Sequence, residues 1–300
     1  MSNAHALDPR LSGFDLEARR AAPIGKLMDP HVHYRGQIGD LETLAKALDH
    51  HRVECVFLIS GRDAGPEWLQ EVERYFAVGR QVIPFYRIGM TRNDPQHVRG
   101  AYDMGFWGIK CIGPSHAYDD HFYDPLYAEA QQLGMPMLFH TGLLAKSGAD
   151  PETGTGMSLM RADMLDTIAA RFPELLIQGA HLGNPEIASA ILSSVYSDNV
   201  IWDASGGCRH LLRVDPKILA APLCGRAQLW DRIMFATDTT SGVFRPEHAD
   251  GWPTVYEYQL AFWQDILSRM PDPPNSEQLD GFFYANADRW LDRIKQKHQG

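Results

Sequence analysis

Two histidines separated by one residue, His31 and His33, stand at the end of the segment Lys26–His33. In an extended chain alternate side chains lie on one face, so both imidazoles would point to the same side. Paired imidazole nitrogens are typical ligands of a transition-metal ion. If the segment is a strand, this spacing predicts the beginning of a metal site.

Polar side chains also end four other apolar runs. They are Lys110 in WGIKCIG, His140 in MLFHTG, His181 in IQGAHLG and Asp238 in MFATD. A buried strand end needs no such group for packing, and a buried charge is costly unless it is paired or bound to metal. A single histidine of this kind is more often a hydrogen-bonded structural residue. The recurrence of such groups at several strand ends favours one shared site.

The elements that must position these side chains alternate between strand and helix. Short apolar runs predict eight strands, which are Lys26–His33, Cys55–Ser60, Gln81–Ile88, Gly108–Ile112, Pro136–His140, Leu175–His181, Val200–Ala204 and Arg232–Asp238. Helical apolar spacing predicts the helices Leu41–Asp49, Pro66–Phe76, Asp94–Met104, Pro125–Leu133, Met160–Arg171, Pro185–Ser193, Thr254–Arg269 and Ser276–Lys295. This alternation predicts a single-domain α/β protein, a (β/α)8 TIM barrel, over residues 1–300, with 1–24 as an N-terminal extension. A doubly wound sheet is the structural alternative, but it would not gather all the strand ends around one centre.

Barrel closure would bring the polar strand ends together at the face formed by the strand-to-helix loops. Two long loops, His140–Ser158 and Asp238–Asp250, would shape that face. Three imidazoles and one carboxylate suit Zn²⁺, which lowers the pKa of a bound water towards about 7. Asp238 beside that water could take its proton and pass it to a leaving group.

The composition argues against some partners. The 300 residues carry a formal net charge of -10, which is unlike a general nucleic-acid or anionic-membrane surface. The cysteines form no CxxC pair, so we expect free thiols in a reducing compartment at Cys55, Cys111, Cys208 and Cys224. The polar amino terminus does not resemble a signal peptide, and no run reaches the ~18 apolar residues of a membrane helix. We therefore expect a cytoplasmic protein that acts on a small molecule.

The motifs DPHVH, GIK, FHTG, AHLG, DRIMFATD and NADRWL occur in this order over residues 27–293. Together they resemble the amidohydrolase superfamily, specifically the amidohydrolase-related branch that includes aminocarboxymuconate-semialdehyde decarboxylase-like proteins. The resemblance implies one divalent metal, usually zinc, with Mn²⁺ as another candidate. Its implied ligands are His31, His33, His140 and Asp238. It also implies that His181 orients or activates the metal-bound water, and that the chain tends to form homodimers.

Lys110 has more than one interpretation. In binuclear members of the superfamily a carboxylated lysine from the fourth strand bridges two metals, and Lys110 lies in a compatible place. In the decarboxylase-like branch a lysine of a GxK segment often lacks that role. We therefore favour a substrate-anion contact or a structural salt bridge. Asn286 falls in the C-terminal motif, where we expect it to cap a helix or bond a loop.

Other cations near strand ends could hold a substrate carboxylate, because a guanidinium offers a planar bidentate fork. The candidates for substrate binding are Arg87, Arg209 and His210, and His116 lies after the fourth strand. Each taken singly is more often a solvated loop charge. Asp203, near the same rim, is a candidate to hold one of the metal-binding histidines in place.

The leading hypothesis is a metal-dependent hydrolase that attacks a small lactone, ester or amide through a metal-activated water. Asp238 would shuttle the proton and His181 would stabilise the developing oxyanion. The close second hypothesis is a metal-dependent non-oxidative decarboxylase, a lyase, of an unsaturated or aromatic carboxylic acid. A lactonase that works without metal also occurs in this branch. A non-catalytic barrel is the hypothesis of a different class, and the complete ligand set disfavours it.

Overall fold

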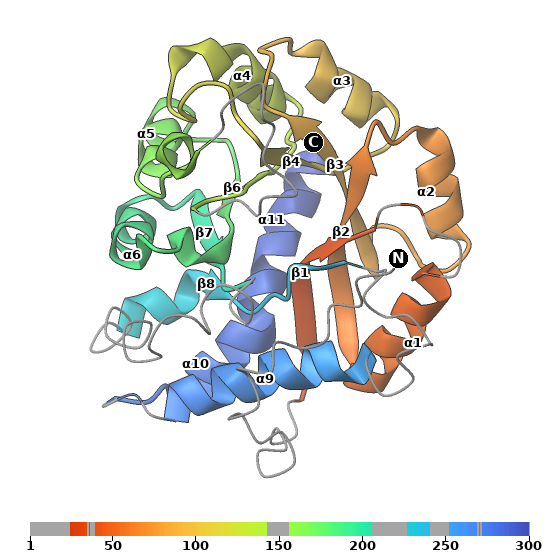
Figure 1. The fold of residues 1–300 in the computed structure, drawn as a ribbon, viewed down its shortest axis with the longest axis vertical. Helices are drawn as coiled ribbons and strands as arrows, with labels where there is room; N and C mark the ends of the chain where they lie inside the picture. The colour runs from red at the N-terminus through yellow and green to blue at the C-terminus, as the bar shows by residue number, and fades with distance from the viewer. Residues whose placement is uncertain are drawn as a thin grey trace, which may run out of the picture.

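The computed structural model describes residues 25–34, 36, 40–142, 156–205, 227–240, 252–268, 270 and 272–299. Its parallel strands curl into a barrel with helices outside (Figure 1), which confirms the predicted (β/α)8 TIM barrel. The strands are β1 (Leu27–His33), β2 (Val53–Arg62), β3 (Val82–Gly89), β4 (Gly108–Ile112), β5 (Met137–Phe139), β6 (Ile177–Gly179), β7 (Val200–Asp203), β8 (Ile233–Met234) and β9 (Thr239–Thr240). The helices are α1 (Asp40–His51), α2 (Pro66–Glu73), α3 (Gln96–Asp103), α4 (Asp124–Gln132), α5 (Met164–Arg171), α6 (Ile187–Tyr196), α9 (Trp252–Ser268), α10 (Ser276–Asp280) and α11 (Asn286–Gln299).

The barrel closes through an eighth strand that is divided into two pieces. Strands β1 to β8 pair in chain order, and β9 returns to pair with β1. The prediction of one continuous strand over Arg232–Asp238 is therefore wrong. Strand pairing stops after Met234 and resumes at Thr239, because the backbone N–H groups between them do not form a regular ladder: they donate to the backbone oxygen of Phe282, the side chain of Asp29 and the backbone oxygen of His31.

The inside of the barrel is filled with apolar side chains and sealed at its amino end by α11. Met28, Phe57 and Leu138 from the strands pack in one cluster with Trp290 and Ile294 of α11. Figure 1 shows α11 running across the barrel strands. The near-continuous apolar runs in the sequence follow from this packing, because these strands are buried on both faces. The polar strand ends therefore open only towards the opposite, carboxyl end of the barrel.

The predicted helix Ser276–Lys295 is interrupted. A π-helical turn, Gly281–Ala285, separates α10 from α11, and it is placed where the backbone oxygen of Phe282 accepts a hydrogen bond from the backbone N–H of Phe235. Asn286 begins α11, and its Nδ2 donates to the backbone oxygens of Trp230 and Ile233. This is the loop-bonding role expected for that asparagine.

Several predicted features lie outside the described residues. These are the N-terminal extension 1–24, Cys208, Cys224, and the greater part of both long loops, at 143–155 and 241–251. Cys55 and Cys111 are buried free thiols, as expected. No helix in the described ranges is both long enough and apolar enough to cross a bilayer.

Candidate metal centre

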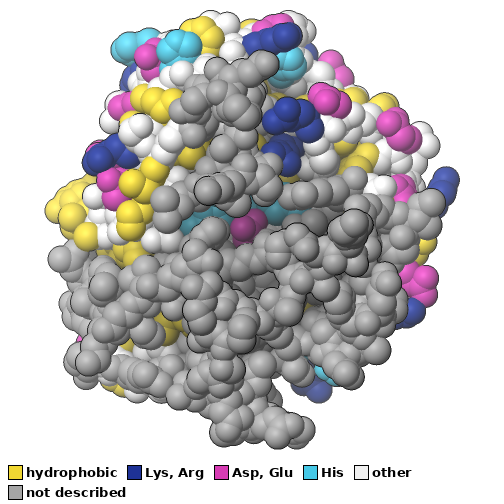
Figure 2. Space-filling model, viewed as in Figure 1, with side chains coloured by type: hydrophobic (Ala, Val, Ile, Leu, Met, Phe, Trp, Pro, Cys, Tyr) yellow, Lys and Arg dark blue, Asp and Glu magenta, His cyan; other side chains and the backbone are white. Residues whose placement is uncertain are grey.

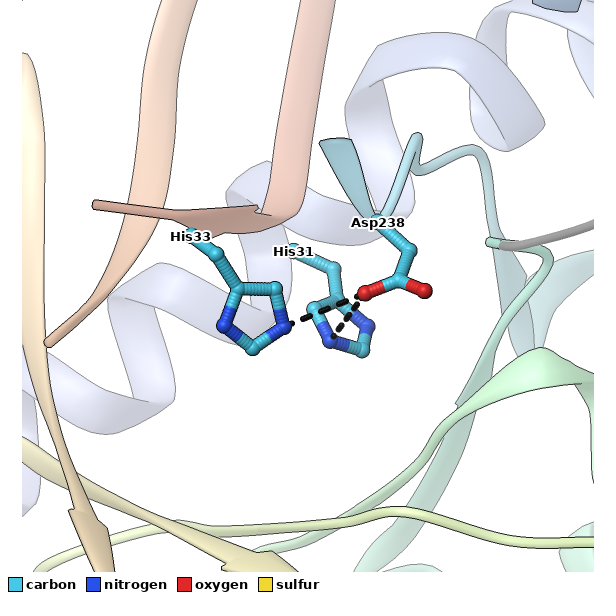
Figure 3. Close-up of side chains that lie close together, drawn as sticks. All are labelled: His31, His33 and Asp238. Carbon is cyan, nitrogen blue, oxygen red and sulfur yellow. Dashed lines mark ion pairs between the residues drawn. The ribbon is translucent and has the colours of Figure 1, made fainter. Parts of the chain in front are cut away.

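The Nε2 atoms of His31 and His33 converge on one oxygen of Asp238 (Figure 3). They lie 3.3 Å and 3.1 Å from Asp238 Oδ1. The two histidines alternate along β1, while Asp238 reaches them from the gap between β8 and β9 with a backbone φ of 53°. Figure 2 shows histidine side chains on either side of a carboxylate near the centre of this face. The paired imidazoles predicted from the spacing thus meet a carboxylate from the far end of the chain.

The buried carboxylate of Asp203, at the end of β7, determines which nitrogen of His31 faces this cluster. Asp203 Oδ2 lies 3.1 Å from His31 Nδ1. Burial would raise the pKa of Asp203, but His31 and His181 hold it well below its ordinary range. Because an ionised carboxylate only accepts hydrogen bonds, His31 Nδ1 carries the proton. In the neutral ring His31 Nε2 then has the lone pair that faces the cluster, as is usual for a metal ligand.

A second chain of hydrogen bonds fixes His181 and His140. His181 Nδ1 lies 3.1 Å from the backbone oxygen of Ser205, which can only accept, so Nδ1 carries the proton. His181 Nε2 is then the acceptor for His140 Nδ1 at 3.1 Å. His140 in turn keeps its lone pair on Nε2. The Ser205 hydroxyl lies 3.0 Å from the Nδ1 atoms of both His31 and His181 and joins the two chains.

The donor set fits a divalent cation. Lone pairs of His31 Nε2 and Asp238 Oδ1 face each other at 3.3 Å, a repulsive contact that the Lys110 ammonium, 3.2 Å from the same nitrogen, relieves in part and that a divalent cation would relieve more fully. Ligand atoms bound to one zinc-sized ion lie about 3.0–3.4 Å apart. The 3.1 Å and 3.3 Å separations of the cluster match this range. Neutral imidazoles with one carboxylate are ligands typical of Zn²⁺ and similar ions.

The described residues contain two groups of three that could hold an ion, and His31 belongs to both. One is His31, His33 and Asp238, and the other is His31, His181 and Asp203. The first group fits better, because Asp203 is already satisfied by hydrogen-bond donors. His140 belongs to neither group, since the structure places it against His181. Its role as a ligand stays a prediction.

Lys110 lies at the cluster, completely buried in β4. Its Nζ donates to the lone pair of His31 Nε2 at 3.2 Å. Burial lowers the pKa of Lys110 to about 8, although the charges of Asp238 and Asp203 oppose this shift. Arg87 pairs in register with Lys110 from the neighbouring strand β3, so both side chains lie on the same face of the sheet.

The remaining predicted residues either make contacts away from the ligand cluster or lie outside the described residues. His116 is exposed and stacks on Phe122, with 4.2 Å between ring centroids. Arg209 and His210 lie outside the described residues. Ser205 was missed by the sequence reasoning, because a single serine after an apolar run carries no signal of its own.

His33, His181 and Asp238 have pKa values far from the ordinary ones. Burial lowers the pKa of His33 to about 4, against the effect of Asp238, and burial lowers that of His181 to about 4 as well. Burial would raise the pKa of Asp238, but the histidines around it hold it well below its ordinary range. At neutral pH His33 and His181 are therefore neutral imidazoles, and Asp238 is an ionised carboxylate.

A (β/α)8 barrel whose titratable groups gather at the carboxyl ends of its strands has the architecture of an enzyme. A family model described as amidohydrolase, Amidohydro_2, matches residues 103–293, which is more than half of the chain. The chain therefore belongs to this amidohydrolase family, as its motifs predicted. No curated protein sequence matches the chain.

Solved structures share the fold at low sequence identity. An uncharacterised TIM-barrel protein from Bordetella bronchiseptica is 15% identical, with a TM-score of 0.64, over 90% of this chain and 100% of that one. A Pseudomonas putida protein described as a 2-pyrone-4,6-dicarboxylic acid hydrolase is 13% identical, with a TM-score of 0.55, over 89% and 98%. A 5-carboxyvanillate decarboxylase from Novosphingobium aromaticivorans, solved with bound manganese, is 13% identical, with a TM-score of 0.53, over 89% and 97%. At these identities the likeness concerns the fold alone.

The neutral buried histidines predict an acid-sensitive metal-free protein. In the unfolded chain His33 and His181 bind protons near pH 6.5, whereas in the folded chain they do so only near pH 4. The free energy of unfolding should therefore fall as the pH drops from about 6.5 to 4, by up to about 1.4 kcal/mol per pH unit for each histidine. Urea unfolding of chelator-treated protein across this range measures the slope. His181→Asn should reduce the slope, and exposed His97→Asn should not. An unchanged slope in His181→Asn would contradict the assignment.

Proposed function

We propose that this chain is a metal-dependent hydrolase that acts on a small lactone, ester or amide. The observation that carries the proposal is the convergence of His31 Nε2 and His33 Nε2 on one oxygen of Asp238. These three residues, together with His140, whose ring lies against His181, would hold one divalent ion, zinc or manganese. Such an ion supplies Lewis-acid polarisation of the substrate carbonyl and makes a nearby water more acidic.

Asp238 is the proposed proton carrier. Its Oδ1 faces the two imidazoles, and its second oxygen points away from them (Figure 3). The side chain is 29% exposed, in contrast to the fully buried His31. Because the carboxylate is ionised, Oδ2 can accept a proton from the attacking water and deliver it to the leaving atom.

His181 is proposed to orient the attacking water by accepting its hydrogen bond at Nε2, and to stabilise the developing oxyanion once Nε2 has taken up a proton. It follows β6 in a turn with φ of 64°, which directs its ring towards His31. Its Nδ1 proton is held by the backbone oxygen of Ser205, so only Nε2 is directed towards His140 and the mouth of the barrel. Burial keeps the ring neutral, which suits a group that accepts and releases hydrogen bonds during turnover.

Arg87 is proposed to bind a carboxylate of the substrate. It is half-buried at the end of β3, beside the wall that carries Lys110. The hydrolase and decarboxylase that share this fold are both named for carboxylic acids. Arg209 and His210 remain proposed contributors to the same contact, and Lys110 a second contact or a bridging carbamate.

A metal-dependent decarboxylase is the second candidate function. Cationic Arg87 and buried Lys110 favour it, since they could hold the substrate carboxylate. A water, directly or by way of Asp238, would supply the proton to the carbon that loses CO2. The two reactions give different products. Ring opening or ester cleavage marks the hydrolase, and CO2 release from acid substrates marks the decarboxylase. A lactonase that needs no metal would stay active after chelation, and a non-catalytic barrel would convert no substrate at all.

Removal of the proton carrier should abolish turnover of either kind. Asp238→Asn should lower kcat by about 10²–10⁴-fold, because the amide cannot take a proton from water. The assay compares zinc- or manganese-loaded protein on a panel of lactones, esters and unsaturated acids. Exposed Asp49→Asn is the matched control and should keep full activity. Full activity in Asp238→Asn, or activity that persists after complete removal of metal, would contradict the proposal.

A carboxylate contact at Arg87 should appear in KM. Arg87→Met should raise KM at least about 10-fold for a substrate with a free carboxylate, since a bidentate charged pair is lost. The methyl ester of the same acid should show little change. Exposed Arg92→Met serves as the control. An equal rise in KM for the acid and its ester would show that Arg87 does not bind the carboxylate.

A further inference from the structure

A buried carboxylate and two isolated backbone hydrogen bonds hold the gap in the eighth strand, where regular sheet pairing is interrupted. Between β8 and β9 the backbone N–H of Phe235 donates to Phe282, and that of Asp238 donates to His31 at 2.9 Å. The N–H of Thr237 donates to Oδ1 of Asp29 at 3.0 Å. Asp29 thus takes the position of a strand partner where the sheet is open.

The side chain of Asp29 collects four donors from three parts of the fold. Thr237 gives its N–H and also its hydroxyl, which lies 2.6 Å from Oδ2. Tyr256 of α9 donates its hydroxyl to the same oxygen at 2.8 Å, and the N–H of His31 lies 3.3 Å from Oδ1. Asp29 is completely buried, so these donors replace water entirely.

The hydrogen bonds of Asp29 constrain the backbone next to Asp238 and therefore the direction of the Asp238 side chain. Asp238 follows Thr237 and adopts a left-handed φ of 53°, a conformation that persists only where the surroundings fix it. Both backbone segments that meet at the site, at His31 and at Thr237, are tied to the one carboxylate of Asp29. The Thr237 hydroxyl also accepts from the N–H of Thr239 at 3.2 Å, which restarts the strand on the far side of Asp238.

We infer that Asp29, acting through Thr237 and Tyr256, is a positioning residue that aims Asp238 at His31 and His33. The inference rests on the proposed function in one respect, because it takes Asp238 to be the functional carboxylate whose position matters. The Thr237 hydroxyl is the critical link, because it contacts Asp29 on one side and Thr239 on the other. Tyr256 connects the Asp29 carboxylate to α9.

Two substitutions at one position test the inference. Thr237→Val keeps the shape but removes the hydroxyl, and Thr237→Ser keeps the hydroxyl but removes the methyl group. Co²⁺ titration followed by visible absorbance should show about 10–100-fold weaker binding for Thr237→Val, the effect expected when an outer partner of a ligand is lost. Thr237→Ser should bind within about threefold of the unsubstituted chain. Binding by Thr237→Val as tight as by Thr237→Ser would overturn the inference.

A metal-free readout separates this inference from the proposed function. In a crystal structure of Thr237→Val without metal, Asp238 Oδ1 should lie more than 4 Å from His33 Nε2, against the present 3.1 Å. An unchanged position would overturn the inference even if Co²⁺ binds to no variant. Tyr256→Phe removes one hydrogen-bond donor to Asp29 and leaves the proposed ligands unchanged. If Thr237→Val does not fold, Tyr256→Phe tests the inference in the same two assays. Unchanged binding and an unchanged Asp238 position in Tyr256→Phe would then overturn the inference.

Discussion

The hydrogen bond from His31 Nδ1 to the buried Asp203 carboxylate is the interaction on which the whole site depends. It places the proton of His31 on the side away from the barrel mouth, and so leaves the lone pair of Nε2 facing His33 and Asp238. Asp203 stays ionised because it also accepts from Gln178 and from two backbone N–H groups. A buried charge of this kind is tolerated only with such complete satisfaction. A neutral or protonated side chain at this position would free His31 to turn its other nitrogen towards the cluster.

The barrel itself supplies the second constraint. The sheet is nearly closed, with β8 and β9 at the two ends of its pairing order, and its interior is filled by apolar side chains up to the level of the ligands. An aspartate can enter this mouth from the eighth strand only where the strand gives up its ladder bonds, which happens between Met234 and Thr239. The backbone oxygens of Phe282 and His31 and the side chain of Asp29 then accept from the N–H groups that the sheet has released. The same opening that positions Asp238 therefore creates the need for a buried polar network behind it.

Much of the fold and of the candidate site could be predicted from the sequence, because each barrel strand is a short apolar run and a polar residue follows where the strand ends. His31, His33, Lys110, His181 and Asp238 were all found in this way, and the structure brings them together. The break in the eighth strand was not predictable, since it depends on Asp29, which is 208 residues from Thr237. Ser205 was missed for the same reason: its hydroxyl matters only through rings that come from distant strands. The π-turn at Gly281–Ala285, whose Phe282 oxygen accepts from the distant Phe235, was not predictable either, because the apolar helical spacing continues across it.

The most direct measurement is anomalous diffraction at the zinc edge from crystals of the zinc-loaded protein. The central claim is that His31, His33 and Asp238 share one ion. It predicts a single strong peak about 2.0–2.3 Å from His31 Nε2, His33 Nε2 and a carboxylate oxygen of Asp238. A peak between His31 Nδ1, His181 and Asp203, or no peak at the carboxyl end of the barrel in fully loaded crystals, would contradict it.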